Sequence, residues 1–141
     1  MNLETLLLII PALGVLALLF TWWKTQEVNA SPEGSDRMSK IAASIQEGAM
    51  AFLKAEYRIL IVFVAGVAAL LYWSGSNNEN SHCLVAVSFA VGAFCSALAG
   101  YLGMKVATKA NVRTANAAKD SLGKALEVAF SGGAVMGLGV V

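Results

Sequence analysis

The chain has 141 residues, of which 57% are hydrophobic and 13% are charged, and its formal net charge is +1. Its mean hydropathy of +0.67 indicates a membrane protein rather than a soluble globular domain. The nearly balanced charge points to no nucleic-acid partner. All ten Lys and Arg residues nevertheless fall within two segments, 24–58 and 105–124.

The first apolar segment predicts a membrane helix. Residues 5–23 form a run of 19 uncharged residues, which is long enough to cross the hydrocarbon core of a bilayer. A cleaved signal peptide would place basic residues before a shorter apolar run, whereas the only charge here is that of Glu4. The segment is therefore interpreted as a retained anchor.

A second long helix is predicted after a turn. Residues 31–34 (SPEG) are typical of a turn, and Ser35 or Asp36 would cap the helix that follows. The helix is expected to begin amphipathic and to enter the membrane, with a span at 52–73. Its apolar face carries Ile41, Ile45, Ala49 and Phe52, and its polar face carries Lys40, Glu47, Lys54 and Arg58. A polar turn at 74–81 is expected to end it.

The third helix, with a predicted span at 83–105, has one face made of small residues. At 100° per residue these residues fall within one sector of the helix. They are Gly92, Ser96, Ala99, Gly100, Gly103, Ala107, Ala110, Thr114 and Ala117. Small side chains let another helix backbone approach closely, which is a main source of helix association in lipid. We predict that this small-residue face is a helix contact surface, with Gly92, Ser96, Gly100 and Gly103 in structural roles.

The last segment predicts the start of a fourth helix, with a span at 127–141. A cap or turn is expected at 120–123, and Ser131-Gly132-Gly133 is interpreted as a packing notch rather than a phosphate cradle. The apolar residues 128–141 would reach about 21 Å as a helix, short of the roughly 30 Å of hydrocarbon. We therefore expect the chain to be the N-terminal part of a longer multi-pass protein, with a re-entrant segment as the alternative.

The distribution of basic residues predicts the topology. Cytoplasmic segments of membrane proteins are enriched in Lys and Arg. This rule places residues 24–58 and 105–124 in the cytoplasm, and the N-terminus and the 74–81 turn outside.

No catalytic, cofactor-binding or metal site is predicted within these residues. The apolar runs 5–23, 59–73, 83–104 and 128–141 contain no ionisable Asp, Glu, Lys or Arg, although transport in a membrane normally requires such groups. Cys83 and Cys95 would lie about 18 Å apart on one helix, too far for a disulfide. His82 has no second ligand at metal-binding spacing.

Four sequence segments together resemble the start of the membrane-bound, ion-translocating inorganic pyrophosphatases. They are IQEGAMAFLKAEY at 45–57, GAFCSALAGYLGM at 92–104, ANVRTANAA at 110–118 and AFSGGAVMG at 129–137. The resemblance covers residues 38–141. It implies an all-α bundle of membrane helices in two rings, in which this chain supplies three outer helices and part of a fourth within a single membrane domain, 1–141.

The resemblance also implies an activity. Members of that family hydrolyse pyrophosphate with Mg²⁺, in some cases with K⁺, and pump H⁺ or Na⁺ across the bilayer. The resemblance also implies that the whole protein forms a homodimer.

 
The family's substrate and gate residues are expected beyond Val141, so none is assigned to a position in this chain, and the chain alone is expected to be inactive. The alternative is a small stand-alone membrane transporter or assembly subunit.

Glu56 departs from the pattern of its helix, since it falls on the apolar face near the membrane boundary. An unpaired charge in such a place is costly. If the second and third helices are antiparallel, Lys105 and Lys109 lie within about one turn of Glu56 along the axis. We predict that Glu56 pairs with one of these lysines in a structural role. The alternatives are that it anchors a cytoplasmic loop over the substrate or extends to water.

Overall fold

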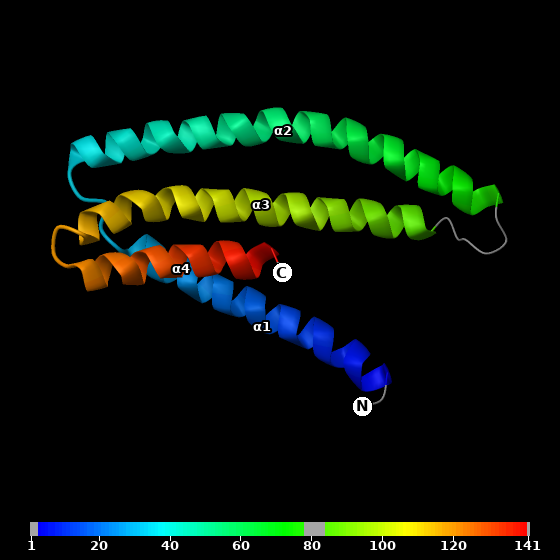
Figure 1. Cartoon of the computed structure of the whole chain (residues 1–141), viewed down its shortest axis with the longest axis horizontal. Helices are drawn as coiled ribbons and strands as arrows, with labels where there is room; N and C mark the ends of the chain where they lie inside the picture. Colours follow the sequence, from blue (N-terminus) through cyan, green and yellow to red (C-terminus); the bar gives the residue numbers. More distant parts are fainter. Residues whose placement is uncertain (1–2, 78–83, 141) are drawn as a thin grey trace.

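The computed structural model describes residues 3–77 and 84–140, and within them the chain is helical apart from two short connections (Figure 1). The helices are α1 (Leu3–Ala30), α2 (Asp36–Asn77), α3 (Leu84–Ala117) and α4 (Leu122–Val140). No strand occurs in the described residues. The predicted all-α fold is therefore confirmed.

Both short connections have the local structure that the sequence predicts. In the first, Gly34 has a φ of +93°, a conformation that favours glycine, and the Ser35 carbonyl accepts the Ser39 N–H at 3.0 Å as α2 begins. In the second, the Ser121 hydroxyl accepts the Lys124 N–H at 3.2 Å. Ser121 is thus the N-cap of α4, because its side chain satisfies a backbone donor in the first turn.

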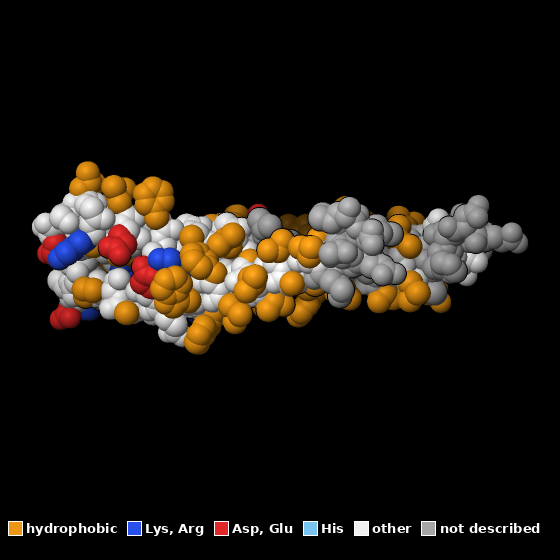
Figure 2. Space-filling model, turned by 90° about the horizontal axis from the view of Figure 1, so that it is seen from below, with side chains coloured by type: hydrophobic (Ala, Val, Ile, Leu, Met, Phe, Trp, Pro, Cys, Tyr) orange, Lys and Arg blue, Asp and Glu red, His pale blue; other side chains and the backbone are white. Residues whose placement is uncertain are grey.

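Three of the helices, α1, α2 and α3, are long and apolar enough to cross a membrane, judged by length and composition. On the visible face, charged side chains gather at one end of the molecule, and apolar side chains are spread along the rest of its described part (Figure 2). The 42 residues of α2 extend about 63 Å, twice the thickness of the hydrocarbon core. The chain is therefore an integral membrane protein whose second helix extends well beyond the bilayer.

The end of α2 differs from the prediction. The sequence predicted a turn beginning at residue 74, but α2 continues to Asn77. A run of small polar residues does not by itself stop a helix, because each backbone N–H still finds the carbonyl four residues earlier. The rest of the predicted turn, with His82 and Cys83, lies outside the described residues. Cys95 is a free, exposed thiol.

Helix α3 is the centre of the bundle. It contacts α1, α2 and α4, while the described residues of α2 contact no other helix than α3. Figure 1 shows α2 and α3 running side by side, with α4 lying along the polar half of α3. A small apolar core forms where α1, α3 and α4 meet, and it consists of Val28, Val106, Ala110 and Val135. Most other large apolar side chains face outward, as expected for a protein whose solvent is lipid.

Candidate functional site

The most extensive polar network joins the α1–α2 loop to α3 through Arg113. Its side chain is only 7% exposed. Nε donates to the Ser31 carbonyl, Nη1 to the Lys109 carbonyl and Nη2 to Glu33 Oε1, each at 2.9 Å. A planar guanidinium offers donors in several fixed directions, so that one side chain can hold three acceptors at once. Arg113 therefore fixes the loop against the polar end of α3.

Neighbouring side chains complete this attachment of the loop. Asn116 Nδ2 donates to the Pro32 carbonyl at 3.3 Å, and the Lys119 amine lies 3.0 Å from the Met38 sulfur. A Cβ added at Gly34 would lie 2.5 Å from Asn116 Oδ1, so the loop backbone packs directly against α3. Because this glycine also has a positive φ, a side chain at this position would be strained.

A second polar cluster links α1 to α4. The Lys24 amine donates to Glu27 Oε2 at 2.7 Å and lies 3.4 Å from the Ser131 hydroxyl. The Ser131 hydroxyl, in a residue only 4% exposed, donates to Glu27 Oε1 at 3.0 Å. The three side chains thus satisfy one another at the polar end of α1, next to the completely buried Val28.

The small-residue face of α3 divides between two neighbouring helices. Gly103 faces α4, where an added Cβ would lie 3.3 Å from Met136 Cγ, and Gly100 faces α2, where it would lie 3.2 Å from the Tyr57 hydroxyl oxygen. A Cβ added at Gly92 would have no neighbour within 4 Å, and Ser96 is exposed. Among the described residues, this face makes helix contacts from Gly100 onward, whereas its start at Gly92 and Ser96 is open.

Helices α3 and α4 approach each other closely at Gly132. A Cβ added at Gly132 would lie only 2.6 Å from the Cβ of Ala110. Two carbon atoms normally approach to about 3.5 Å, so glycine is required at this crossing. The interpretation of Ser131-Gly132-Gly133 as a packing notch fits this geometry, although only Gly132 makes the close approach, because Gly133 has no neighbour within 4 Å.

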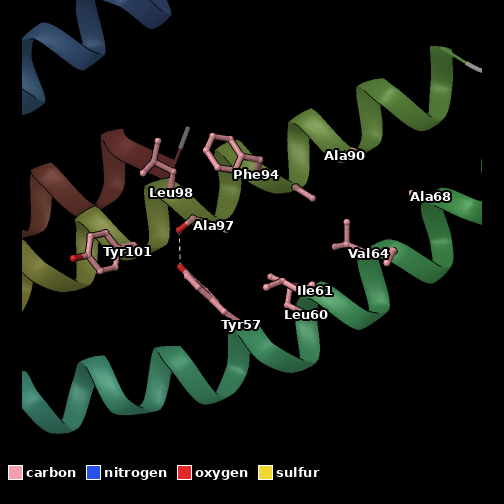
Figure 3. A pocket seen from close by; sticks show the side chains of 12 residues that line it. Tyr57, Leu60, Ile61, Val64, Ala68, Ala90, Phe94, Ala97, Leu98 and Tyr101 are labelled. Carbon is pink, nitrogen blue, oxygen red and sulfur yellow. Dashed lines mark hydrogen bonds between the residues drawn. The ribbon is translucent and has the colours of Figure 1, made fainter.

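Tyr57 makes a polar contact between α2 and α3. Its hydroxyl donates to the Ala97 carbonyl at 2.5 Å (Figure 3). A helix carbonyl has a second lone pair that remains available after the intrahelical bond is made. The bond fixes the register of the two helices, and Gly100 leaves the room that the tyrosine needs.

The ion pair predicted for Glu56 is absent. Glu56 is exposed and forms no ion pair with Lys105, Lys109 or any other described residue. The Lys105 amine lies over the Tyr101 ring, 5.8 Å from its centroid, and the Lys109 carbonyl accepts a bond from Arg113. The prediction failed because it used the depth of the residues along the helices, whereas a contact also requires that their side chains point toward each other.

The described residues contain no donor set for a metal. In the ranges 3–77 and 84–140, no three His, Cys, Asp or Glu side chains form a group that could hold an ion. The Mg²⁺ implied by the resemblance therefore has no fitting site in this part of the chain. The polar contacts described above hold α1, α3, α4 and the α1–α2 loop in fixed positions.

Comparison with known proteins identifies the relatives. The family model described as "Inorganic H+ pyrophosphatase" matches residues 15–141. The chain belongs to this family. The match confirms the resemblance that the sequence segments indicated, and it extends over the second half of α1 as well.

Individual relatives are similar along most of this chain. A putative K⁺-stimulated pyrophosphate-energized sodium pump of Clostridium tetani is 47% identical over 89% of the chain. A K⁺-insensitive pyrophosphate-energized proton pump 2 of Moorella thermoacetica is 50% identical over 94% of it, and a proton pump of Methanosarcina mazei is 38% identical over 98%. The chain spans 18%, 19% and 20% of these relatives, respectively.

Arg113 and Ser131 were not singled out as contact residues by sequence reasoning. Arg113 was considered only as one of the basic residues of the segment 105–124, and its acidic partner Glu33 lies 80 residues away in the chain. One feature of the sequence could have pointed to Arg113, namely that it is a charged residue within a run of mostly small residues. An arginine at a helix contact needs hydrogen-bond acceptors on the neighbouring segment.

We predict that the contact of Gly100 with Tyr57 is measurable against a matched glycine. Gly100→Ala and Gly92→Ala gain the same helix propensity, but only the first places a Cβ 3.2 Å from the Tyr57 hydroxyl. Gly100→Ala should therefore be less stable than Gly92→Ala by about 0.5–1.5 kcal/mol, the range for one hydrogen bond. Thermal unfolding of both variants in detergent, followed by circular dichroism, would measure this. Equal midpoints of thermal unfolding for the two variants would mean that the contact of Gly100 with Tyr57 contributes nothing to stability.

Proposed function

We propose that the chain is part of a membrane pyrophosphatase, which couples the hydrolysis of pyrophosphate to the transport of H⁺ or Na⁺, and that it forms outer scaffold helices of that enzyme. Family membership over residues 15–141 is the observation that carries the proposal. The names of the relatives describe pyrophosphate-energized pumps for sodium or protons. The polar networks of the chain join helices and a loop, which is the role of a scaffold.

The catalytic groups belong to other parts of such an enzyme. Mg²⁺, and K⁺ where it is used, would be bound outside this segment, and a homodimer would be the assembled form. The names of the relatives differ in K⁺ dependence, and both kinds are similar to this chain. The segment is therefore compatible with either ion and with either K⁺ behaviour.

A chimeric enzyme would test this function. The matching segment of the Moorella thermoacetica proton pump, 50% identical, is replaced by residues 1–141. We expect the chimera to hydrolyse pyrophosphate and pump, because the scaffold contacts are retained. The purified chain alone, assayed with pyrophosphate and Mg²⁺, should show no turnover above background. A chimera that is inserted and stable but hydrolyses no pyrophosphate would contradict the proposal, as would turnover by the chain alone.

We further propose that the N-terminus lies outside and that the segments 24–58 and 105–124 lie in the cytoplasm, as the distribution of basic residues favours. Single cysteines at the exposed positions Ser76 and Lys119 would test this in a background without Cys83 and Cys95. Ser76→Cys should react with an impermeant thiol reagent in intact cells, and Lys119→Cys only after lysis. The reverse labelling pattern would mean that the chain has the opposite orientation in the membrane.

A further inference from the structure

A groove between α2 and α3 is apolar along most of its length. A cavity of about 570 Å³ lies between the two helices, with Leu60, Ile61 and Val64 on one side and Phe94 and Leu98 on the other (Figure 3). An adjoining cavity of about 540 Å³ shares Tyr57, Ile61 and Tyr101 with the first and adds Lys54 and Arg58. The two cavities form one groove, whose cations lie in the smaller cavity.

The cations at this end are not neutralised within the described residues. Lys54 and Arg58 are exposed, and neither forms an ion pair there. Lys105 adds a third positive charge nearby, since its amine lies over Tyr101, which lines both cavities. Glu56 does not compensate, because it is two residues from each of Lys54 and Arg58 and so points to another side of α2, turned by about 200°.

The part of the groove beyond its cations matches one leaflet of a bilayer in length. From Arg58 to Ala68, the last α2 residue lining the larger cavity, the helix rises about 15 Å. This is half of the roughly 30 Å hydrocarbon core. The part from Arg58 to Ala68 is thus as long as a single acyl chain, and Lys54 and Arg58 lie at the end of this part where a lipid headgroup would be.

We propose that this groove binds an anionic phospholipid, with an acyl chain between α2 and α3 and the phosphate beside Lys54 and Arg58. Arg and Lys bind phosphate oxygens through charge-assisted hydrogen bonds, and basic residues at a bilayer surface attract anionic lipids. Apolar side chains along the groove supply the contacts for the acyl chain. The proposal requires insertion into a membrane, but it depends neither on pyrophosphate hydrolysis nor on the direction of insertion.

Native mass spectrometry of the full chain, purified in mild detergent, would test the charged end. Phosphatidylglycerol and phosphatidylcholine with identical acyl chains are added at equal concentrations. We expect tighter binding of phosphatidylglycerol, and Lys54→Gln/Arg58→Gln should weaken it roughly 10- to 30-fold, given the contribution of each basic residue. The control, Arg37→Gln/Lys40→Gln, removes the same charge from exposed positions of α2 that line neither cavity and should leave binding unchanged.

A second variant tests the apolar part. Ala90 is exposed and lines the larger cavity, so Ala90→Phe should fill the groove and weaken the binding of both lipids several-fold. Lys54→Gln/Arg58→Gln should instead weaken the binding of the anionic lipid alone. Helix content by circular dichroism establishes that each variant is folded. Equal binding of the two lipids would overturn the proposal. So would an equal loss of phosphatidylglycerol binding in Arg37→Gln/Lys40→Gln and in Lys54→Gln/Arg58→Gln. A dimer mass without bound lipid would also overturn it, because the groove would then hold a second copy of the chain.

Discussion

Arg113→Ala is expected to lower the free energy of unfolding by about 2–4 kcal/mol, because it removes three hydrogen bonds and a largely buried charge at once. The variant leaves the Ser31 carbonyl without its side-chain donor, the Lys109 carbonyl with only its helical bond, and Glu33 without its ion-pair partner. Glu33 is 44% exposed and can turn to water, which keeps the loss below that of a fully buried pair. The α1–α2 loop should separate from α3.

Two further variants define the cause of this loss. Arg113→Lys keeps the charge but cannot reach three acceptors in different directions, so it should recover little of the stability. Lys124→Gln removes the exposed ion pair with Asp120, in which both side chains are more than 60% exposed, and should change stability by less than about 0.5 kcal/mol. The measurement is reversible unfolding in detergent, with limited proteolysis of the 31–35 loop as a local readout. Full stability of Arg113→Lys would mean that the charge alone matters.

Features set by short stretches of sequence were predicted well. The start of α2 after Ser35, where Ser35 or Asp36 was predicted as the cap, and the cap or turn predicted at 120–123, where Ser121 caps α4, each depend on neighbours within a few residues. The glycine turn at Gly34 does so as well. The same holds for the membrane helices, since a long apolar run has few other ways to satisfy its backbone in lipid. Such features can be recognised without knowing which helices are neighbours.

Features set by the rotation of one helix against another were not predicted. Glu56 lies at a depth where a lysine could reach it, but its side chain is exposed and Lys105 lies over Tyr101 instead. The small-residue face of α3 was predicted as one contact surface, yet Gly100 meets α2 and Gly103 meets α4. A helical wheel gives the direction of each side chain on its own helix, but it does not say where the partner helices lie.

The polar end of the bundle has a consistent physical design. Lys24, Glu27 and Ser131 join α1 to α4, and Arg113 joins the α1–α2 loop to α3. The close approach of Gly132 to Ala110 then joins α4 to α3. Because α3 takes part in two of these three connections, a change in its spacing from α4 should be transmitted to the whole end of the molecule.

Gly132→Ala should lower the free energy of unfolding by about 2–3 kcal/mol, the upper part of the range for overpacked contacts. The new Cβ would lie 2.6 Å from the Cβ of Ala110, and both atoms are fixed to helix backbones, so α3 and α4 must separate. Gly133→Ala is the matched control, since its Cβ would have no neighbour within 4 Å. That variant should gain about 0.5–1 kcal/mol from helix propensity.

The exchange of the two residues gives the decisive comparison for this contact. Ala110→Gly/Gly132→Ala restores one methyl group at the crossing, and its helix-propensity terms cancel, so its stability should return to within about 1 kcal/mol of the original chain. Ala110→Gly alone should be destabilised by about 1 kcal/mol. Unfolding of all four proteins in the same detergent measures the coupling between the positions. If the double variant were as unstable as Gly132→Ala, the loss would arise elsewhere than at the Ala110 contact.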